Sequence, residues 1–234
     1  MSPSTFPGGA WYVSEEVRYF PDLLSFVRRR ITKVQMSSMS KVFIESTIEL
    51  RNWLASNHTS SESVWLVKWK KDSGKLYFGY DDMVDELICF GWVDSLPRKL
   101  NEQQTMILIS PRNPKSNWSK VNKDRVERLL RTGRMHESGM AMVKTAKENG
   151  AWDFLNDVEQ LILPPDLESA FGLNERAKYY YERFPNSSKR GILEWIKNAK
   201  KDSTRNKRIA ETVSKAAMNI KANHPKGRDL GPKE

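Results

Sequence analysis

The spacing of hydrophobic residues predicts strands only in the first half of this chain. Val64–Trp69 and Thr105–Ile109 are short apolar runs rich in β-branched and aromatic residues, which is typical of buried strands. Leu76–Phe78 and Trp92–Asp94 predict two shorter extended segments beside them. Because few strands must share a core with many helices, we expect an α+β fold with a small, mainly antiparallel sheet packed with helices, followed by a helical C-terminal subdomain.

Helices are predicted wherever apolar residues return every three or four positions. Their limits are expected at capping residues: Asp81 or Asp82 and Ser119 or Asn122 can begin a helix, whereas Gly91, Gly133 and Gly150 can end one. The predicted helices span residues 42–56, 81–91, 119–133, 137–149, 175–184, 187–200 and 204–222.

Changes in composition predict four parts along the chain. Residues 1–41 begin with Ser, Pro and Gly and continue with an apolar, basic patch at Val17–Arg30, so we expect a disordered extension there. An α+β domain is expected over residues 42–163. The pair Pro164-Pro165 marks its boundary with a helical subdomain over residues 164–222, and residues 223–234 predict a disordered polar tail.

Composition and charge narrow the classes of function. The net charge of +10 favours anionic partners such as nucleic acid, an anionic membrane surface or an acidic protein, although lysine-rich helix faces are often merely solvated. The only cysteine, Cys89, excludes an intrachain disulfide and a multi-cysteine zinc site. It fits a reducing compartment, and we expect a cytoplasmic location. No apolar run is long enough to span a membrane.

The least ordinary residues lie between Tyr80 and Ser119. In the loop Pro111–Ser119, two prolines stiffen the backbone that carries Arg112 and Lys115, close to a predicted helix N-terminus. Such a loop can receive a carboxylate or a phosphate. The alternative is that its polar groups only cap the helix and satisfy the backbone. The candidate ligand-binding residues are Asp85, Glu86, Trp92, Asp94, Ser95, Arg112, Lys115, Ser116, Trp118 and Asn122.

Patterns typical of catalysis or metal binding are missing from the sequence. His58, His136 and His224 lack the spacing of metal ligands, and there is no glycine-rich phosphate loop and no HExxH motif. On a helix, Asp85 would lie one turn from Cys89, and a neighbouring carboxylate raises the pKa of a thiol, which is the wrong direction for a nucleophile. We therefore expect no catalytic residue, no metal and no cofactor.

Two basic segments leave nucleic-acid binding open as an alternative. Residues 112–134 and residues 189–208 each carry eight Lys or Arg against two acidic residues. Trp118 and Trp195 are interleaved with them as stacking platforms would be, although Trp195 shares an apolar face with Ile192 and Ile196. The candidate residues for this alternative are Lys120, Lys123, Arg128, Arg131, Lys200, Lys201, Arg205 and Arg208.

Several multi-residue motifs follow one another in a recognisable order. They are Trp53-Leu with Asn57-His, Trp65-Leu-Val with Lys70-Lys, Asp85-Glu-x-x-Cys-Phe-Gly-Trp-Val-Asp-Ser95, Pro111-Arg-x-Pro-Lys-Ser-x-Trp-Ser119, Asn122-Lys with Arg125-Val, and Gly191-Ile-Leu-Glu-Trp-Ile-Lys-Asn-Ala-Lys-Lys with Thr204-Arg-x-Lys-Arg-Ile209. In this order they resemble the YdeI/OmpD-associated family, also labelled bacteriocin-protection proteins, over roughly Val42 to Ile220. Ile88 stands before Cys89 where the family pattern leads us to expect Ala.

The resemblance implies stress tolerance or protection from cationic antimicrobial peptides, with a link to an outer-membrane protein, and it supplies no reaction and no catalytic residues. We therefore expect a soluble, non-enzymatic protective protein whose partner is a small anionic ligand or a membrane-associated protein. Nucleic-acid binding is one alternative. An enzyme acting on a small anionic substrate is another, and it requires the carboxylates, Trp92 and Arg112 to line one cavity.

Overall fold

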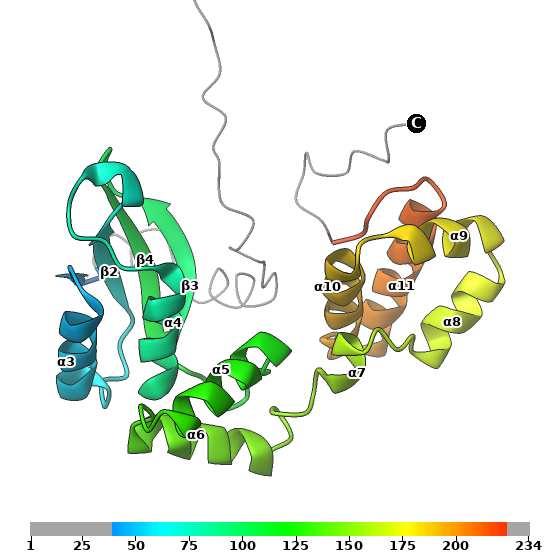
Figure 1. Cartoon of the computed structure of the whole chain (residues 1–234). Helices are drawn as coiled ribbons and strands as arrows, with labels where there is room; N and C mark the ends of the chain where they lie inside the picture. Colours follow the sequence, from blue (N-terminus) through cyan, green and yellow to red (C-terminus); the bar gives the residue numbers. More distant parts are fainter. Residues whose placement is uncertain (1–38, 224–234) are drawn as a thin grey trace, which may run out of the picture.

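The computed structural model describes residues 39–223 and has a four-stranded sheet at the centre of its first half (Figure 1). The strands are β1 (Lys41–Phe43), β2 (Val64–Trp69), β3 (Trp92–Lys99) and β4 (Gln104–Pro111), in the order β1-β2-β4-β3. β1 pairs with β2 in parallel, and the other two pairings are antiparallel. The expected α+β class with a mainly antiparallel sheet is confirmed.

One face of the sheet carries the first hydrophobic core. Leu66 of β2 lies opposite Ile107 of β4, and both belong to the buried cluster that the helices complete. The helices α3 (Thr47–Asn57) and α4 (Tyr80–Cys89) pack here through buried residues such as Leu50 and Leu87. This helix-covered face places α4 across the strands, and α4 carries the acidic residues that the sequence marked.

Three of the predicted element limits near the sheet were wrong. Residues 41–43 form β1 instead of the start of a helix, because Ser46 caps α3 by accepting a hydrogen bond from the backbone N–H of Glu49 at 3.2 Å. Leu76–Phe78 is not a strand. β3 runs on to Lys99 through a register shift between Asp94 and Pro97, and it tolerates Pro97 because it is an edge strand.

A glycine on α6 allows this helix to approach the end of α4 closely. The helices α5 (Lys120–Arg131) and α6 (Glu137–Glu148) follow the loop Pro111–Ser119, and α6 crosses the end of α4. A Cβ atom at Gly139 would lie 2.2 Å from the carbonyl oxygen of Cys89, so only glycine fits there. Gly91 ends α4 with a φ of +73°, as its position in the sequence predicted.

The second half of the described chain is helical and has a core of its own. It comprises α7 (Asn156–Glu159), α8 (Pro165–Gly172), α9 (Glu175–Arg183), α10 (Asn186–Lys197) and α11 (Asp202–Ala216). Their buried residues form a second cluster that begins with Leu155, nine residues before Pro164. The sequence predicted α9, α10 and α11 but missed α7 and α8, which are too short for a periodic signal. The boundary at Pro164 stays a prediction, and the extension up to residue 38 lies outside the described residues.

Lys68 is a lysine buried on the helix-covered face, with 4% of its surface exposed. Its ammonium group donates a hydrogen bond to the carbonyl oxygen of Phe78 and lies 4.2 Å from the centre of the Phe78 ring and 4.7 Å from that of Tyr77. Burial lowers the pKa of Lys68 from 10.5 to about 8, and the carboxylate of Asp82 opposes this shift only in part.

The free energy of unfolding should therefore rise between about pH 8 and pH 10.5 through Lys68. In this window the unfolded lysine is still protonated while the folded one has lost its proton, so raising the pH favours the folded state. Lys68→Met should remove about 2–4 kcal/mol of this rise, measured as the pH dependence of urea unfolding. The parent-minus-variant difference isolates Lys68 from Cys89, whose raised pKa acts in the opposite sense. Exposed Lys75→Met is the control variant. If the free energy of unfolding depends on pH equally in the parent and in Lys68→Met, the assignment to Lys68 is contradicted.

Candidate functional site

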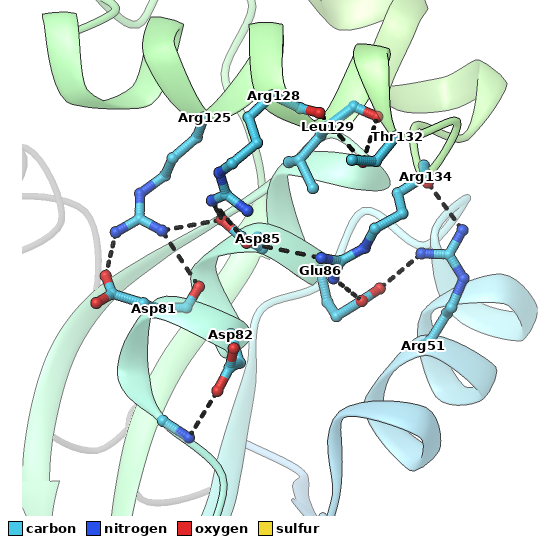
Figure 2. Close-up of polar contacts among 11 residues, drawn as sticks. Arg51, Asp81, Asp82, Asp85, Glu86, Arg125, Arg128, Leu129, Thr132 and Arg134 are labelled. Atoms are coloured by element: carbon cyan, nitrogen blue, oxygen red, sulfur yellow. Dashed lines mark hydrogen bonds and ion pairs between the residues drawn. The ribbon is translucent and has the colours of Figure 1, made fainter.

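Asp85 and Glu86 are buried carboxylates that are fully engaged by arginines (Figure 2). Both oxygens of Asp85 accept from Nη2 of Arg128 at 2.8 Å, and Oδ1 also accepts from Nη1 of Arg125 at 2.9 Å. Glu86 accepts from Nη1 of Arg51 at 2.8 Å and from Nη2 of Arg134 at 2.6 Å. Since two guanidinium groups already serve each carboxylate, neither is poised to exchange protons with a substrate.

This carboxylate–arginine cluster, formed by Asp85, Glu86 and the four arginines, joins separate elements of the first core. Arg51 comes from α3, Arg125 and Arg128 come from α5, and Arg134 lies in the turn before α6. Arg125 also pairs with Asp81 in the first turn of α4, and Nη2 of Arg51 donates to the carbonyl oxygen of Arg134 at 2.8 Å. The cluster therefore holds α4 between α3 and α5 (Figure 2).

The sequence marked the two acids but not all of their partners. Arg125 and Arg128 are three positions apart on one helix face, and this spacing is the only local signal that they act together. Arg51 and Arg134 lie 35 and 48 positions from Glu86, so only the fold brings them to it.

Cys89 is buried and shows no activation as a nucleophile. Burial raises the pKa of its thiol, the carboxylate of Glu86 raises it further, and Arg51 only partly opposes both effects. The expected direction of the shift is right, but the acid beside the thiol is Glu86 rather than Asp85. His58 and His136 do not serve Cys89 as a base, because their rings pack on each other at 4.8 Å and their Nδ1 atoms bond to Ala55 and Ser138.

Trp92, Asp94 and Ser95 lie on β3, and each is satisfied by a neighbour of its own. Trp92 is buried and donates from Nε1 to the carbonyl oxygen of His58 at 3.2 Å. Asp94 accepts from the hydroxyl of Tyr80 at 2.6 Å, and burial raises the pKa of this carboxyl. The hydroxyl of Ser95 donates to a backbone carbonyl of β4 at 3.1 Å. Like the acids of α4, these side chains therefore have partners within the chain.

A cavity of about 320 Å³ does open elsewhere on the first core, between the start of β1 and the end of α3. Val42, Trp53 and Asn57 are among the residues that line it. None of the predicted site residues does, so this cavity gives no support to an enzyme acting through them.

Arg112 is, like Lys68, a buried cation that no carboxylate meets within ion-pairing distance, and unlike Lys68 it keeps a donor without a partner. Only 5% of its surface is exposed, its Nη2 donates to the carbonyl oxygen of Asn117 at 2.6 Å, and its Nε has no hydrogen-bond partner. The guanidinium carbon lies 3.8 Å from the centre of the Trp118 ring. Burial lowers the pKa of Arg112 to about 10, although Asp94 opposes the shift from a distance beyond ion pairing.

The rest of the loop Pro111–Ser119 lies against both halves of the chain. Nδ2 of Asn117 donates to Oδ1 of Asn198 after α10 at 3.0 Å, and Nδ2 of Asn198 is itself buried without a partner. Lys115 is exposed and Ser116 is half-buried. The loop ends at Ser119, whose hydroxyl caps α5 by accepting from the backbone N–H of Asn122 at 3.4 Å, so the cap predicted at Ser119 is confirmed.

The contacts that Lys120 and Lys123 make with the second half are also polar. Oε1 of Glu159 accepts from the backbone N–H of Lys120 at 3.0 Å, and Nζ of Lys123 donates to Oδ1 of Asn156 at 2.6 Å. The two hydrophobic clusters share no residue. We call this meeting of the halves, around Asn117, Lys120 and Lys123, the polar joint; small polar interfaces of this kind leave relative movement open.

The candidate nucleic-acid residues are mostly engaged within the chain. Lys120 and Arg205 pair with Asp124 and Asp166, and Arg208 donates to a backbone carbonyl. Lys123 and Arg128 take part in the contacts above. Among the described residues, only Arg131, Lys200 and Lys201 of that set have side chains without a hydrogen bond or ion pair. This arrangement does not favour the nucleic-acid alternative.

Two protein-family models match different halves of the chain. Residues 42–142 match a domain of unknown function (DUF8412). Residues 160–219 match the family described as bacteriocin-protection, YdeI or OmpD-associated. The expected resemblance is thus confirmed for the helices from α8 to α11, whereas the motifs of α4 and of the loop Pro111–Ser119 lie in the half that the other model matches. Neither a curated protein nor a solved structure matches the chain.

Neither a membrane-spanning helix nor a metal site is found in residues 39–223. No helix in that range is both long and apolar enough to cross a bilayer. No group of three or more His, Cys, Asp or Glu side chains in that range could hold a metal ion.

Glu86→Gln should destabilise the chain by about 1–3 kcal/mol, because it leaves Arg51 and Arg134 without their shared carboxylate. Urea unfolding measures this effect. The matched control is Asp124→Asn, which breaks an exposed pair with Lys120 and should cost less than about 0.5 kcal/mol. If both variants lose the same small amount, the cluster does not hold α4 in place.

Proposed function

We propose that this chain is a non-enzymatic protein of the bacteriocin-protection type that binds a small anion, a carboxylate or a phosphate group, at Arg112. The match of residues 160–219 to the bacteriocin-protection family supports the first part. The second part rests on one observation: Arg112 is a buried cation without a carboxylate within ion-pairing distance.

Burial of an uncompensated charge is costly, and proteins usually avoid it by pairing. This chain applies that rule to the carboxylates of α4, each of which has two arginine partners. At Arg112, the ring of Trp118 and one backbone carbonyl replace only part of the lost hydration. An anion that accepts from Nε would supply the missing charge and satisfy the unpartnered donor.

Access to Arg112 requires a movement, because the side chain is almost fully covered. The polar joint supplies the element that moves. Asn117 contributes both the carbonyl that receives Arg112 and the amide that reaches Asn198, so separating the halves at this contact would loosen the cover of the guanidinium. Lys115, exposed on the same loop, would then attract the anion from solvent.

The net charge of +10 bears on how such a protein protects. A strongly basic chain repels a cationic peptide, so direct capture of the peptide is unfavourable. We therefore place protection in the recognition of an anionic group, borne by a small molecule or by a membrane-associated partner, rather than in sequestration of the toxic peptide.

Inorganic phosphate is the first ligand to test. At about ten times its Kd it should stabilise the chain by about 1.4 kcal/mol and raise Tm by about 3–6 °C. Arg112→Gln should abolish this phosphate-dependent rise, whatever its effect on Tm in phosphate-free buffer. Because phosphate stabilises many proteins by exclusion, the comparison is made within each variant. The same rise in the parent and in Arg112→Gln would refute binding at this residue, and Lys75→Gln, at an exposed lysine outside the loop, serves as the control of equal charge change.

Cell survival tests the protective role itself. Cells that lack the gene should survive a cationic antimicrobial peptide less well, and the parent gene should restore survival. Arg112→Gln, expressed to the same level, should restore less than Lys120→Ala, whose side chain pairs only with an exposed acid. Unchanged survival without the gene would argue against protection even if phosphate binds.

A further inference from the structure

The sheet has a second face, opposite the one that α3 and α4 cover. Its side chains alternate with the core residues along three strands, and the pairings Phe43↔Val67, Trp65↔Leu108 and Val67↔Met106 place them together. Lys41 and Trp69 lie on the same face, where Trp69 packs on Phe43 at 5.3 Å. Most members of this second face are apolar or aromatic: Phe43, Trp65, Val67, Trp69, Met106 and Leu108. Its polar members include Gln104, opposite Trp69, and Arg98, which lies opposite Met106 with its guanidinium carbon 5.4 Å from the centre of the Trp65 ring.

The middle of this second face is as well buried as a core. Trp65 and Leu108 are each 1% exposed, and Val67 is 5% exposed. Yet these three residues belong to neither of the hydrophobic clusters in which the described helices bury their side chains. Flanking strands cannot bury a side chain that stands perpendicular to the sheet, so this face requires a covering layer.

We propose that the patch Val17–Arg30, which precedes the described residues, covers the second face of the sheet. The chain enters the sheet beside this face, because β1 begins at Lys41 and the side chain of Lys41 lies on it. The patch offers Leu23, Leu24, Phe26 and Val27 within five positions.

The length of the connection allows this arrangement. From Val27 to Lys41 there are fourteen residues, which can span up to about 45 Å, whereas four strands cover only about 15 Å. Because the patch is tethered at the edge strand, its effective concentration at the face is in the millimolar range, well above that of a second copy in dilute solution. The basic run Arg28–Arg30 would leave the face toward solvent.

Thiol labelling of the full chain tests the proposal. With Val67→Cys, maleimide should react slowly in the parent, and roughly tenfold or more faster when Leu24→Ser and Phe26→Ser are added. Phe43→Cys, at a position 39% exposed, gives the fast reference, and buried Cys89 gives the slow one. Phe6→Ser, outside the patch, should leave Val67→Cys protected.

Each other outcome overturns the proposal. Fast labelling of Val67→Cys in the parent would mean that the face is open. Protection that persists after Leu24→Ser and Phe26→Ser would mean that something else covers it, and protection that disappears on dilution would identify a second copy. If the altered chain unfolds, so that Cys89 also reacts, photo-crosslinking decides: benzoylphenylalanine at Phe26 should crosslink to residues 64–69 or 104–111 of its own chain, and crosslinks elsewhere or none would refute the assignment.

Discussion

The pairing of Asp85 and Glu86 with four arginines is the interaction on which the first half of the molecule depends. Carboxylates with 4% of their surface exposed would strongly destabilise the fold if they were unpaired. Two guanidinium groups compensate the burial of each one. Because α3, α5 and the turn before α6 each contribute, none of these elements can leave without exposing an unpaired charge. The cluster thus holds these elements together through ion pairs, as the hydrophobic core does through apolar contacts.

The same rule makes Arg112 stand out. Around α4, buried charge is balanced and the hydrogen bonds of the carboxylates are met, so those residues act in structure. At the end of β4, a cation of similar burial has a ring, one carbonyl and a free donor, but no anion. The acidic and basic residues between Tyr80 and Ser119 therefore look alike in the sequence but differ in the structure. Those of α4 belong to a network in which each charge is paired, whereas Arg112 belongs to one that lacks an anion. The proposal of an anion at Arg112 rests on this difference.

Local patterns predicted much of the fold, and distant partners account for what was missed. Short apolar runs, helical periodicity and glycine C-caps were enough for β2, β4 and the helices that end at Gly91, Gly133 and Gly150, because these signals lie within a few residues. The N-cap predicted at Asp81 or Asp82 was wrong, because α4 begins at Tyr80 after Gly79. β1 was missed since three residues carry no periodicity, and the length of β3 was missed because Pro97 ordinarily ends a strand. In the site, Asp85, Glu86 and Arg112 were identified by type. Their opposite roles depend on Arg51 and Arg134, which only the folded chain brings to α4.

The polar joint has a consequence for how this chain could have arisen. Each half has its own hydrophobic cluster, and the two halves match different family models. The polar joint consists of a few hydrogen bonds. The second half needs to supply only three acceptors: one for Asn117, one for the backbone of Lys120 and one for Lys123. A gene fusion that brought the two segments together would have needed no new core to be stable.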